Sequence, residues 1–362
     1  MEKMPTPPVF VGNDKRREQW ERPVKIVNAL EELEELCGFK LPKSLQKVES
    51  RELSPKQLVD IDDRALRNPK CPNIIFGRPH AGEYFPEELW KRMDKEKAGK
   101  TLAIVDRGTD NIFRSPKIAS VGTKISRLAV DPNRVPSMGQ EDPHNKKAIG
   151  KVVWKEGIFG ESIYNEGEEP NDAEAEDLVE NYYLPYYNAM MAAVGTVADR
   201  RESSEERILV IDGHSCMNNK EFDWVWKRYE VDDPEFLPLF LLGDQDGKFC
   251  DPDIMEAFAK ALEDEFEKLS EKEKAGLLKN SKAKKIIAIN EILKGVHNVN
   301  FYGQRREGIN AIQLEVNEAS FVDCKDNSYY DSEYNDYNMR LIQRIIERAS
   351  LAINSLLKNE TN

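Results

Sequence analysis

Short apolar runs alternate with amphipathic stretches in the chain after about residue 69. The runs that favour buried strands cover residues 74–76, 102–105, 128–130, 208–211 and 311–316. Apolar residues recur at helical spacing over residues 186–198, 251–269, 275–293 and 338–357. This alternation predicts a three-layer α/β domain over residues 69–362, in which helices cover both faces of a mixed, mostly parallel sheet.

Residues 1–68 have a different pattern, and we expect them to form a small N-terminal helical extension. Apolar residues lie at helical spacing between residues 18 and 37. Ser54 and Pro55 then begin a second helix, with serine as the cap and proline at the first helical position. This stretch holds no candidate catalytic cluster.

Charge limits the classes of partner. Charged residues make up 33% of the 362 residues and the net charge is −13, whereas about 25% is typical of soluble proteins. A nucleic-acid-binding protein needs a basic face, so we expect no nucleic-acid partner. An acidic surface still allows a local basic pocket for a small anionic molecule.

The cysteines and the N-terminal sequence indicate a cytoplasmic protein. The first ten residues contain adjacent prolines and lack the long apolar core of a signal peptide. The most apolar stretch, residues 236–242, is far too short to span a bilayer, so we expect no membrane partner. The five cysteines have no CxxC spacing and are odd in number, which is typical of a reducing compartment.

Two of the four histidines follow predicted strands. His80 and Glu83 come after the strand at 74–76, and His214 comes after the strand at 208–211. A His-x-x-Glu pair with a distant histidine supplies three ligands to a catalytic zinc and leaves a fourth position for water. The pair alone is a weak signal in a glutamate-rich chain. Two clusters at strand ends, where open α/β sheets place their ligands, predict one zinc ion per chain.

Donor groups and one unusual acid accompany these candidates. Arg127, Asn133 and Arg134 lie beside the predicted strand at 128–130, and an arginine fork matches a carboxylate or a developing oxyanion. On this stretch alone, surface arginines and a turn asparagine are the simpler interpretation. Glu315 interrupts an apolar strand, where burial would raise its pKa toward that of a general base. Its alternative is an edge position that faces solvent.

Two further residues have weaker signals. Asp106 follows the predicted strand at 102–105, where it either orients a metal-binding histidine or caps the next segment. Tyr302 precedes the Glu315 strand. It either leans over the pocket as a mobile donor or packs on the surface.

Two rival functions belong to other classes. Residues 213–217 approximate the G-x-S-x-G motif of serine hydrolases, with Ser215 as the nucleophile. Met217 stands where that tight turn needs a small residue, and His297 is the only downstream histidine that a triad could use. A catalytically inactive binding protein would be expected to lack a ligand or the base, and every candidate position here is filled.

Taken together, the ordered blocks resemble the N-formylglutamate amidohydrolase family, which is itself similar to zinc carboxypeptidases. The matching stretches are residues 78–86 (RPHAGEYFP), 106–110 (DRGTD), Arg127 with 131–134 (DPNR), 183–186 (YLPY), 211–215 (IDGHS), and 302–303 (YG) with 312–315 (IQLE). The resemblance implies a carboxypeptidase-like fold and zinc held by His80, Glu83 and His214. It also implies a catalytic carboxylate at Glu315 and substrate contacts from Arg127, Asn133 and Arg134.

Three departures from the family pattern bear on the substrate more than on the metal. Ala81, Pro132 and Tyr187 stand where the family usually has serine, a leucine-like residue and histidine. We therefore predict a zinc-dependent amidohydrolase that cleaves a small anionic N-acyl amino acid of the N-formyl type, such as N-formylglutamate. The alternatives are a carboxypeptidase-like peptidase that acts on a small peptide and the serine hydrolase.

Overall fold

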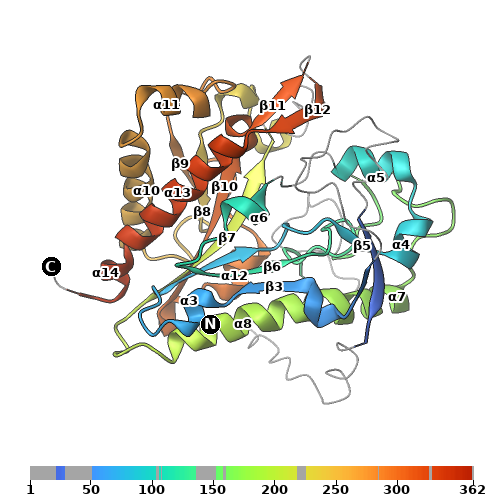
Figure 1. The fold of residues 1–362 in the computed structure, drawn as a ribbon, viewed down its shortest axis with the longest axis horizontal. Helices are drawn as coiled ribbons and strands as arrows, with labels where there is room; N and C mark the ends of the chain where they lie inside the picture. The colour runs from blue at the N-terminus through green and yellow to red at the C-terminus, as the bar shows by residue number, and fades with distance from the viewer. Residues whose placement is uncertain are drawn as a thin grey trace.

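A seven-stranded sheet forms the centre of the computed structural model, which describes residues 22–28, 51–102, 106, 108–135, 152–157, 160–217, 226–283, 285–325 and 328–360. The strand order is β3-β6-β4-β7-β10-β8-β9 (Figure 1). The strands are β3 (Val59–Asp62), β4 (Ile74–Arg78), β6 (Ala119–Thr123), β7 (Ile208–Cys216), β8 (Phe240–Gly243), β9 (Ile287–Ile289) and β10 (Ile309–Asn317).

The sheet is mixed and mostly parallel, as predicted. Strands β6, β4, β7 and β10 run parallel to one another, and β8 is parallel to β9. Among the described strands of this sheet, the antiparallel pairs are β3 with β6 and β8 with β10. Because the four central strands share a direction, the segments that follow them emerge at one edge of the sheet.

Alternate side chains of the central strands enter two different cores. One core takes Ile74, Phe76, Leu209, Ile211, Ile312 and Leu314 together with helices α10 (Pro252–Glu267) and α13 (Asp336–Ala352). The other takes Ile75, Ile208, Val210 and Ala311 together with α8 (Leu184–Ala198) and α12 (His297–Tyr302). Figure 1 shows α10 and α13 on one side of the sheet and α8 on the other, so the predicted three layers are present.

Smaller elements surround this centre. A three-stranded sheet holds β1 (Val24–Asn28), β2 (Arg51–Leu53) and β5 (Tyr84–Pro86), and a hairpin holds β11 (Val322–Lys325) and β12 (Ser328–Tyr334). Among the described residues, the other α-helices are α3 (Arg64–Arg67), α4 (Glu87–Arg92), α5 (Lys95–Leu102), α6 (Thr109–Ile112), α7 (Asp172–Leu178), α11 (Glu271–Leu277) and α14 (Asn354–Leu357). A π-helical turn, Val179–Tyr183, precedes α8, and short 3-10 helices cover Pro55–Leu58, Lys227–Tyr229, Pro234–Phe236, Arg305–Glu307 and Glu318–Ser320.

The structure confirms the strands at 74–76, 208–211 and 311–316 and the helices at 186–198 and 251–269. Two predictions were wrong. The buried run at 128–130 lies in a turn, and the neighbouring strand is β6, whose small and polar residues give little hydrophobic signal. The stretch at 275–293 contains the end of α11 and then strand β9. The predicted strand at 102–105 lies outside the described residues except for Leu102, which ends α5.

The described part of the N-terminal extension differs from the helical prediction. Its first strand, β1, pairs with β5, and Ile26 is fully buried there. Strand β3 forms one edge of the central sheet. Ser54 and Pro55 do begin a helix, a 3-10 turn in which the side chain of Gln57 accepts the backbone N–H of Ser54. Throughout the described ranges, no helix combines the length and hydropathy needed to cross a bilayer.

Candidate metal centre

Strand register brings the candidate residues together at the carboxyl ends of the central strands. His214 on β7 lies beside Glu315 on β10, and Asp212 lies beside Gln313 in the same parallel pair. His80 lies two residues beyond the end of β4, the other neighbour of β7. The loop that follows His80 packs tightly on the backbone at residues 124–125, since a Cβ on Gly82 would lie 2.3 Å from the carbonyl oxygen of Ile125.

The two histidines face each other through the same ring atom. His80 Nδ1 and His214 Nδ1 are 3.0 Å apart. The Oδ2 atom of Asp106 lies 2.8 Å from the first nitrogen and 2.7 Å from the second. Among the described residues, these three side chains form a group whose ligand atoms all lie within 4.8 Å of one another, an arrangement that can hold a metal ion.

The opposite nitrogen of each ring is held by a second carboxylate. His80 Nε2 lies 2.8 Å from Asp131 Oδ1, and His214 Nε2 lies 2.8 Å from Asp212 Oδ2. An ionised carboxylate only accepts, so both contacts favour a proton on Nε2. A bound metal ion would take the place of the proton that Asp106 otherwise favours on each Nδ1. Two imidazole nitrogens and a carboxylate oxygen are a donor set that zinc accepts, so these residues fit the predicted ion.

Arg127 connects the carboxylates on the His80 side. Its two terminal nitrogens lie 2.7 Å from Asp106 Oδ1 and 2.8 Å from Asp131 Oδ2. Burial would raise the pKa of the Asp131 carboxyl, but the guanidinium of Arg127 and the ring of His80 hold it well below its usual range. The indole nitrogen of Trp154 donates a further hydrogen bond to Asp131, at 3.3 Å. Asp131 is therefore ionised and fixed behind His80.

Glu315 has the opposite electrostatic state. Burial raises the pKa of its carboxyl to about 8, and the negative charge of Asp106 adds to the shift, while His214 and Arg127 oppose it. Gln313, two residues earlier on the same face of β10, donates to Glu315 Oε1 at 2.8 Å. The edge-strand alternative is wrong, because β10 lies between β7 and β8. The arrangement leaves a buried acid that can exchange a proton near neutral pH beside the metal group.

Asn133 and Arg134 lie in the turn that follows Asp131. The Asn133 side chain is buried, with its Nδ2 atom 3.2 Å from His214 Nε2. The guanidinium of Arg134 donates to the carbonyl oxygen of Asn133 at 3.1 Å and approaches Asp131 Oδ2 only to 3.9 Å. Within the described part of the chain, Arg134 thus makes no hydrogen bond to a carboxylate.

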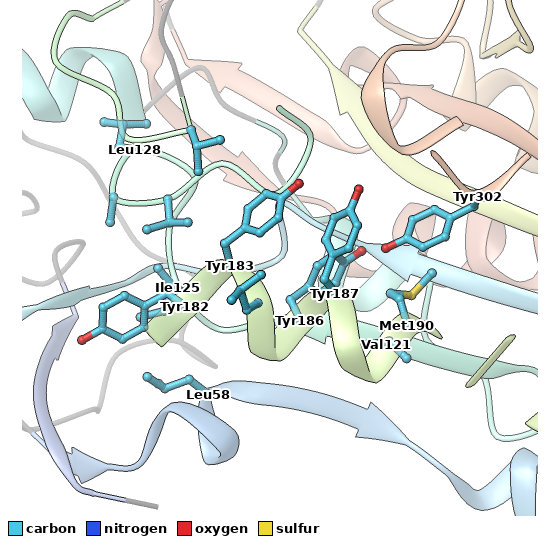
Figure 2. Close-up of a cluster of buried hydrophobic side chains, with 14 of the residues drawn as sticks. Leu58, Val121, Ile125, Leu128, Tyr182, Tyr183, Tyr186, Tyr187, Met190 and Tyr302 are labelled. Carbon is cyan, nitrogen blue, oxygen red and sulfur yellow. The ribbon is translucent and has the colours of Figure 1, made fainter. Parts of the chain in front are cut away.

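Tyr302 and Glu83 are two further predicted site residues. Tyr302 is 3% exposed, so it is not a surface aromatic, and its contact with the substrate stays a prediction. Figure 2 shows its ring beside those of Tyr186 and Tyr187, in a buried group of tyrosines along α8. Glu83 is half-buried, and its backbone N–H donates to the carbonyl oxygen of Lys124. In the group found here the carboxylate is Asp106, and metal binding by Glu83 stays a prediction.

The geometry around Ser215 does not match a serine nucleophile. The residue lies inside β7, not on a sharp strand-to-helix turn, and its hydroxyl donates to Glu318 at 2.8 Å. His297, the histidine that a triad would need, contacts the hydroxyl groups of Tyr183 and Tyr187 through Nε2.

Sequence reasoning missed Asp131 and Asp212 as partners of the histidines. Asp212 carried a usable signal, since it lies two residues before His214 on one strand and so shares its face. Asp131 carried none, because the contact with His80 joins two loops.

Comparisons with known proteins identify the family of this chain and a structure that shares its fold. A family model described as N-formylglutamate amidohydrolase matches residues 73–322, more than half of the chain. No curated protein matches. Among solved structures, an N-formylglutamate amidohydrolase from Ralstonia eutropha JMP134 has 20% identity and a TM-score of 0.58, over 84% of this chain and 99% of that chain, so the two share a fold.

Two further structures are more distant. A gene product of Agrobacterium tumefaciens has 13% identity and a TM-score of 0.48, over 83% of this chain and 96% of that chain. A metallo-carboxypeptidase from Burkholderia cenocepacia has 14% identity and a TM-score of 0.27, over 78% of this chain and 56% of that chain. On the extent of the family match, the chain belongs to the N-formylglutamate amidohydrolase family.

Proposed function

We propose that this protein is a zinc-dependent amidohydrolase that cleaves the amide bond of a small N-acyl amino acid of the N-formylglutamate type. One observation carries the proposal. A group of two histidines and a carboxylate that can hold a metal lies beside a buried glutamate, Glu315, whose pKa is raised to about 8. Family membership supports the same reaction class.

His80 and His214 would hold the ion through Nδ1. The third protein ligand is a carboxylate, for which the sequence pattern favours Glu83 and the interatomic distances favour Asp106. A zinc ion bound there would lower the pKa of a water molecule and polarise the scissile carbonyl. Asp131 and Asp212 would keep both rings in the orientation that binding requires.

Glu315 is the proposed general base. It would take a proton from the attacking water molecule and deliver that proton to the leaving nitrogen. Glu315 lies beside His214 on the neighbouring strand, which supports a role next to the proposed ion. Burial supports the role, because a carboxyl of ordinary pKa would be a weaker proton acceptor.

Three donors would act on the substrate. The positive charge of Arg127, held within the centre by Asp106 and Asp131, would stabilise the negative charge that develops on the carbonyl oxygen. Among the described residues, the guanidinium of Arg134 makes no hydrogen bond to a carboxylate. Arg134 would therefore bind the carboxylate of the substrate, and the amide of Asn133 would assist it. Tyr302, which is as buried as Asn133, is a further candidate for contact with the substrate.

The peptidase alternative uses the same centre and differs in the acyl group. The test is therefore a substrate panel for the zinc-loaded protein, comprising N-formyl amino acids, N-acetyl amino acids and dipeptides, with release of the free amino acid as the readout. We expect hydrolysis of N-formyl substrates that stops when the metal is removed and returns with zinc. Turnover that persists after chelation, or turnover of dipeptides alone, would overturn the proposal.

A further inference from the structure

A buried asparagine outside the predicted site contacts both groups that flank His214 Nε2. Asn298 lies in the first turn of α12 and has no exposed surface. Its backbone N–H donates to Asn133 Oδ1 at 3.0 Å, and its side-chain Nδ2 donates to Asp212 Oδ1 at 3.0 Å. Asn133 and Asp212 in turn lie 3.2 and 2.8 Å from His214 Nε2.

The backbone contact decides which way the amide of Asn133 faces. A backbone N–H only donates, so the atom of Asn133 that meets it must be the oxygen. The amide NH₂ group of Asn133 then lies 3.2 Å from His214 Nε2, where a donor cannot pair with a protonated nitrogen, so this contact does not favour a proton on Nε2. A flipped amide would place two donors against each other at Asn298, in a region where an unmade hydrogen bond is costly.

The side-chain contact acts on Asp212. One oxygen of that carboxylate faces His214 Nε2 and the other faces the amide of Asn298. Both oxygens are therefore engaged, and the carboxylate cannot rotate without breaking a buried hydrogen bond. Held in this orientation, Asp212 favours a proton on His214 Nε2 and leaves Nδ1 available.

We propose that Asn298 is a positioning residue for the metal centre. It fixes the carboxylate of Asp212, and through Asp212 the tautomer and orientation of His214. The proposal rests on the proposed function, because it assumes that His214 binds a metal through Nδ1. Asn298 touches neither the proposed ion nor the reacting atoms. Its effect is expected in metal affinity and in the protonation pattern of one imidazole ring.

The test uses two variants and one matched control. Asn298→Ala removes the amide, and Asn298→Leu removes it while keeping a similar volume. Asn338→Ala is the control, because Asn338 is also buried and donates two hydrogen bonds, to the carbonyl oxygens of Gly276 and Ser320. The zinc dissociation constant is measured by chelator competition, and the ring nitrogens of His214 are observed by ¹⁵N NMR.

We expect both Asn298 variants to bind zinc about 10–100-fold more weakly than the parent, as loss of an outer partner of a metal-bound histidine does. The control should bind zinc as the parent does, even where its stability falls. Parent-like affinity in a folded Asn298 variant would overturn the inference. A parent protein that binds no zinc would instead overturn the proposed function.

The NMR measurement on the parent keeps the inference testable if neither variant folds. In the zinc-loaded parent, His214 must carry its proton on Nε2, the atom that faces the carboxylate of Asp212. A proton on Nδ1 would contradict the inference directly.

Discussion

His80 and His214 lie with their Nδ1 atoms 3.0 Å apart although 134 residues separate them in the sequence. The parallel pairing of β4 and β7 explains the contact, because both residues lie near the same edge of the sheet. Each ring is held from behind by its own aspartate, Asp131 or Asp212. Two rings fixed in this way turn their Nδ1 atoms toward one point, which is what a metal site requires.

The first prediction concerns metal content. The purified protein should carry about one zinc ion per chain, because three protein ligands and an open position describe a catalytic zinc site. His80→Ala and His214→Ala should each lose the ion, as measured by elemental analysis of the folded proteins. Zinc retained at full stoichiometry in both variants would rule out the two histidines as ligands.

The same measurement assigns the third ligand. Glu83→Gln and Asp106→Asn each replace a carboxylate by an amide of equal size, and the variant with the lower zinc content identifies the ligand. Asp106 lies within 2.8 Å of both Nδ1 atoms, whereas Glu83 has the spacing of the sequence motif. Full zinc content in both would mean that neither carboxylate is needed.

The second prediction concerns the base. Glu315→Gln should keep the fold and the zinc and lose roughly 10²–10⁴-fold in kcat, the usual contribution of a general base. The amide keeps the size of the side chain and can still pair with Gln313, but it cannot accept the proton of the water molecule. Gln313→Ala is the control, since it removes the partner and leaves the carboxylate. Near-normal kcat in a zinc-loaded Glu315→Gln protein would assign the base to another group.

The third prediction concerns the stability of the metal-free protein. Burial raises the pKa of Glu315 from 4.5 to about 8, so at intermediate pH the folded chain keeps a proton that the unfolded chain has released. The contribution of Glu315 to the free energy of unfolding therefore decreases as the pH rises from about 5 to about 8. Above pH 8 this contribution is constant.

Glutamine does not titrate, so the Tm of metal-free Glu315→Gln should rise relative to the Tm of the metal-free parent as the pH increases across this window. Thermal unfolding of both proteins over the same series of buffers checks the expectation. A difference in Tm that stays constant with pH would show that Glu315 keeps an ordinary pKa.

How much of the fold followed from the sequence depended on the hydrophobic signal of each element. Strands β4, β7 and β10 were predicted because each is a run of large apolar residues between polar segments. Strand β6 was not, because Ala-Ser-Val-Gly-Thr is buried on both faces without being strongly hydrophobic. The run at 128–130 misled the prediction because burial in a turn gives the same short apolar signal as a strand.

The site divides in a similar way. His80, His214 and Glu315 were identified because each directly follows or interrupts an apolar strand, so local sequence carried the signal. The contacts of Asp106 with both histidines, and of Asn298 with Asp212, join segments that are distant in sequence. The spacing of residues along the sequence does not predict such contacts. Only these contacts indicate which ring nitrogen of each histidine would bind the metal.

The last prediction concerns substrate class. The guanidinium of Arg134 has the donor geometry for a carboxylate, and in the structure it lies 3.9 Å from Asp131 without a hydrogen bond to it. We therefore expect N-formyl amino acids with a free α-carboxylate to be hydrolysed and their carboxamide analogues to be poor substrates. A lost hydrogen bond to a charged group costs about 1.5–3 kcal/mol, so Arg134→Ala should lower kcat/KM strongly for the acid and much less for the amide.

Arg92→Ala is a matched control, because Arg92 pairs with Glu174 away from the metal group and its removal should affect both substrates equally and weakly. Equal losses on the acid and the amide in Arg134→Ala would place that guanidinium outside the substrate site.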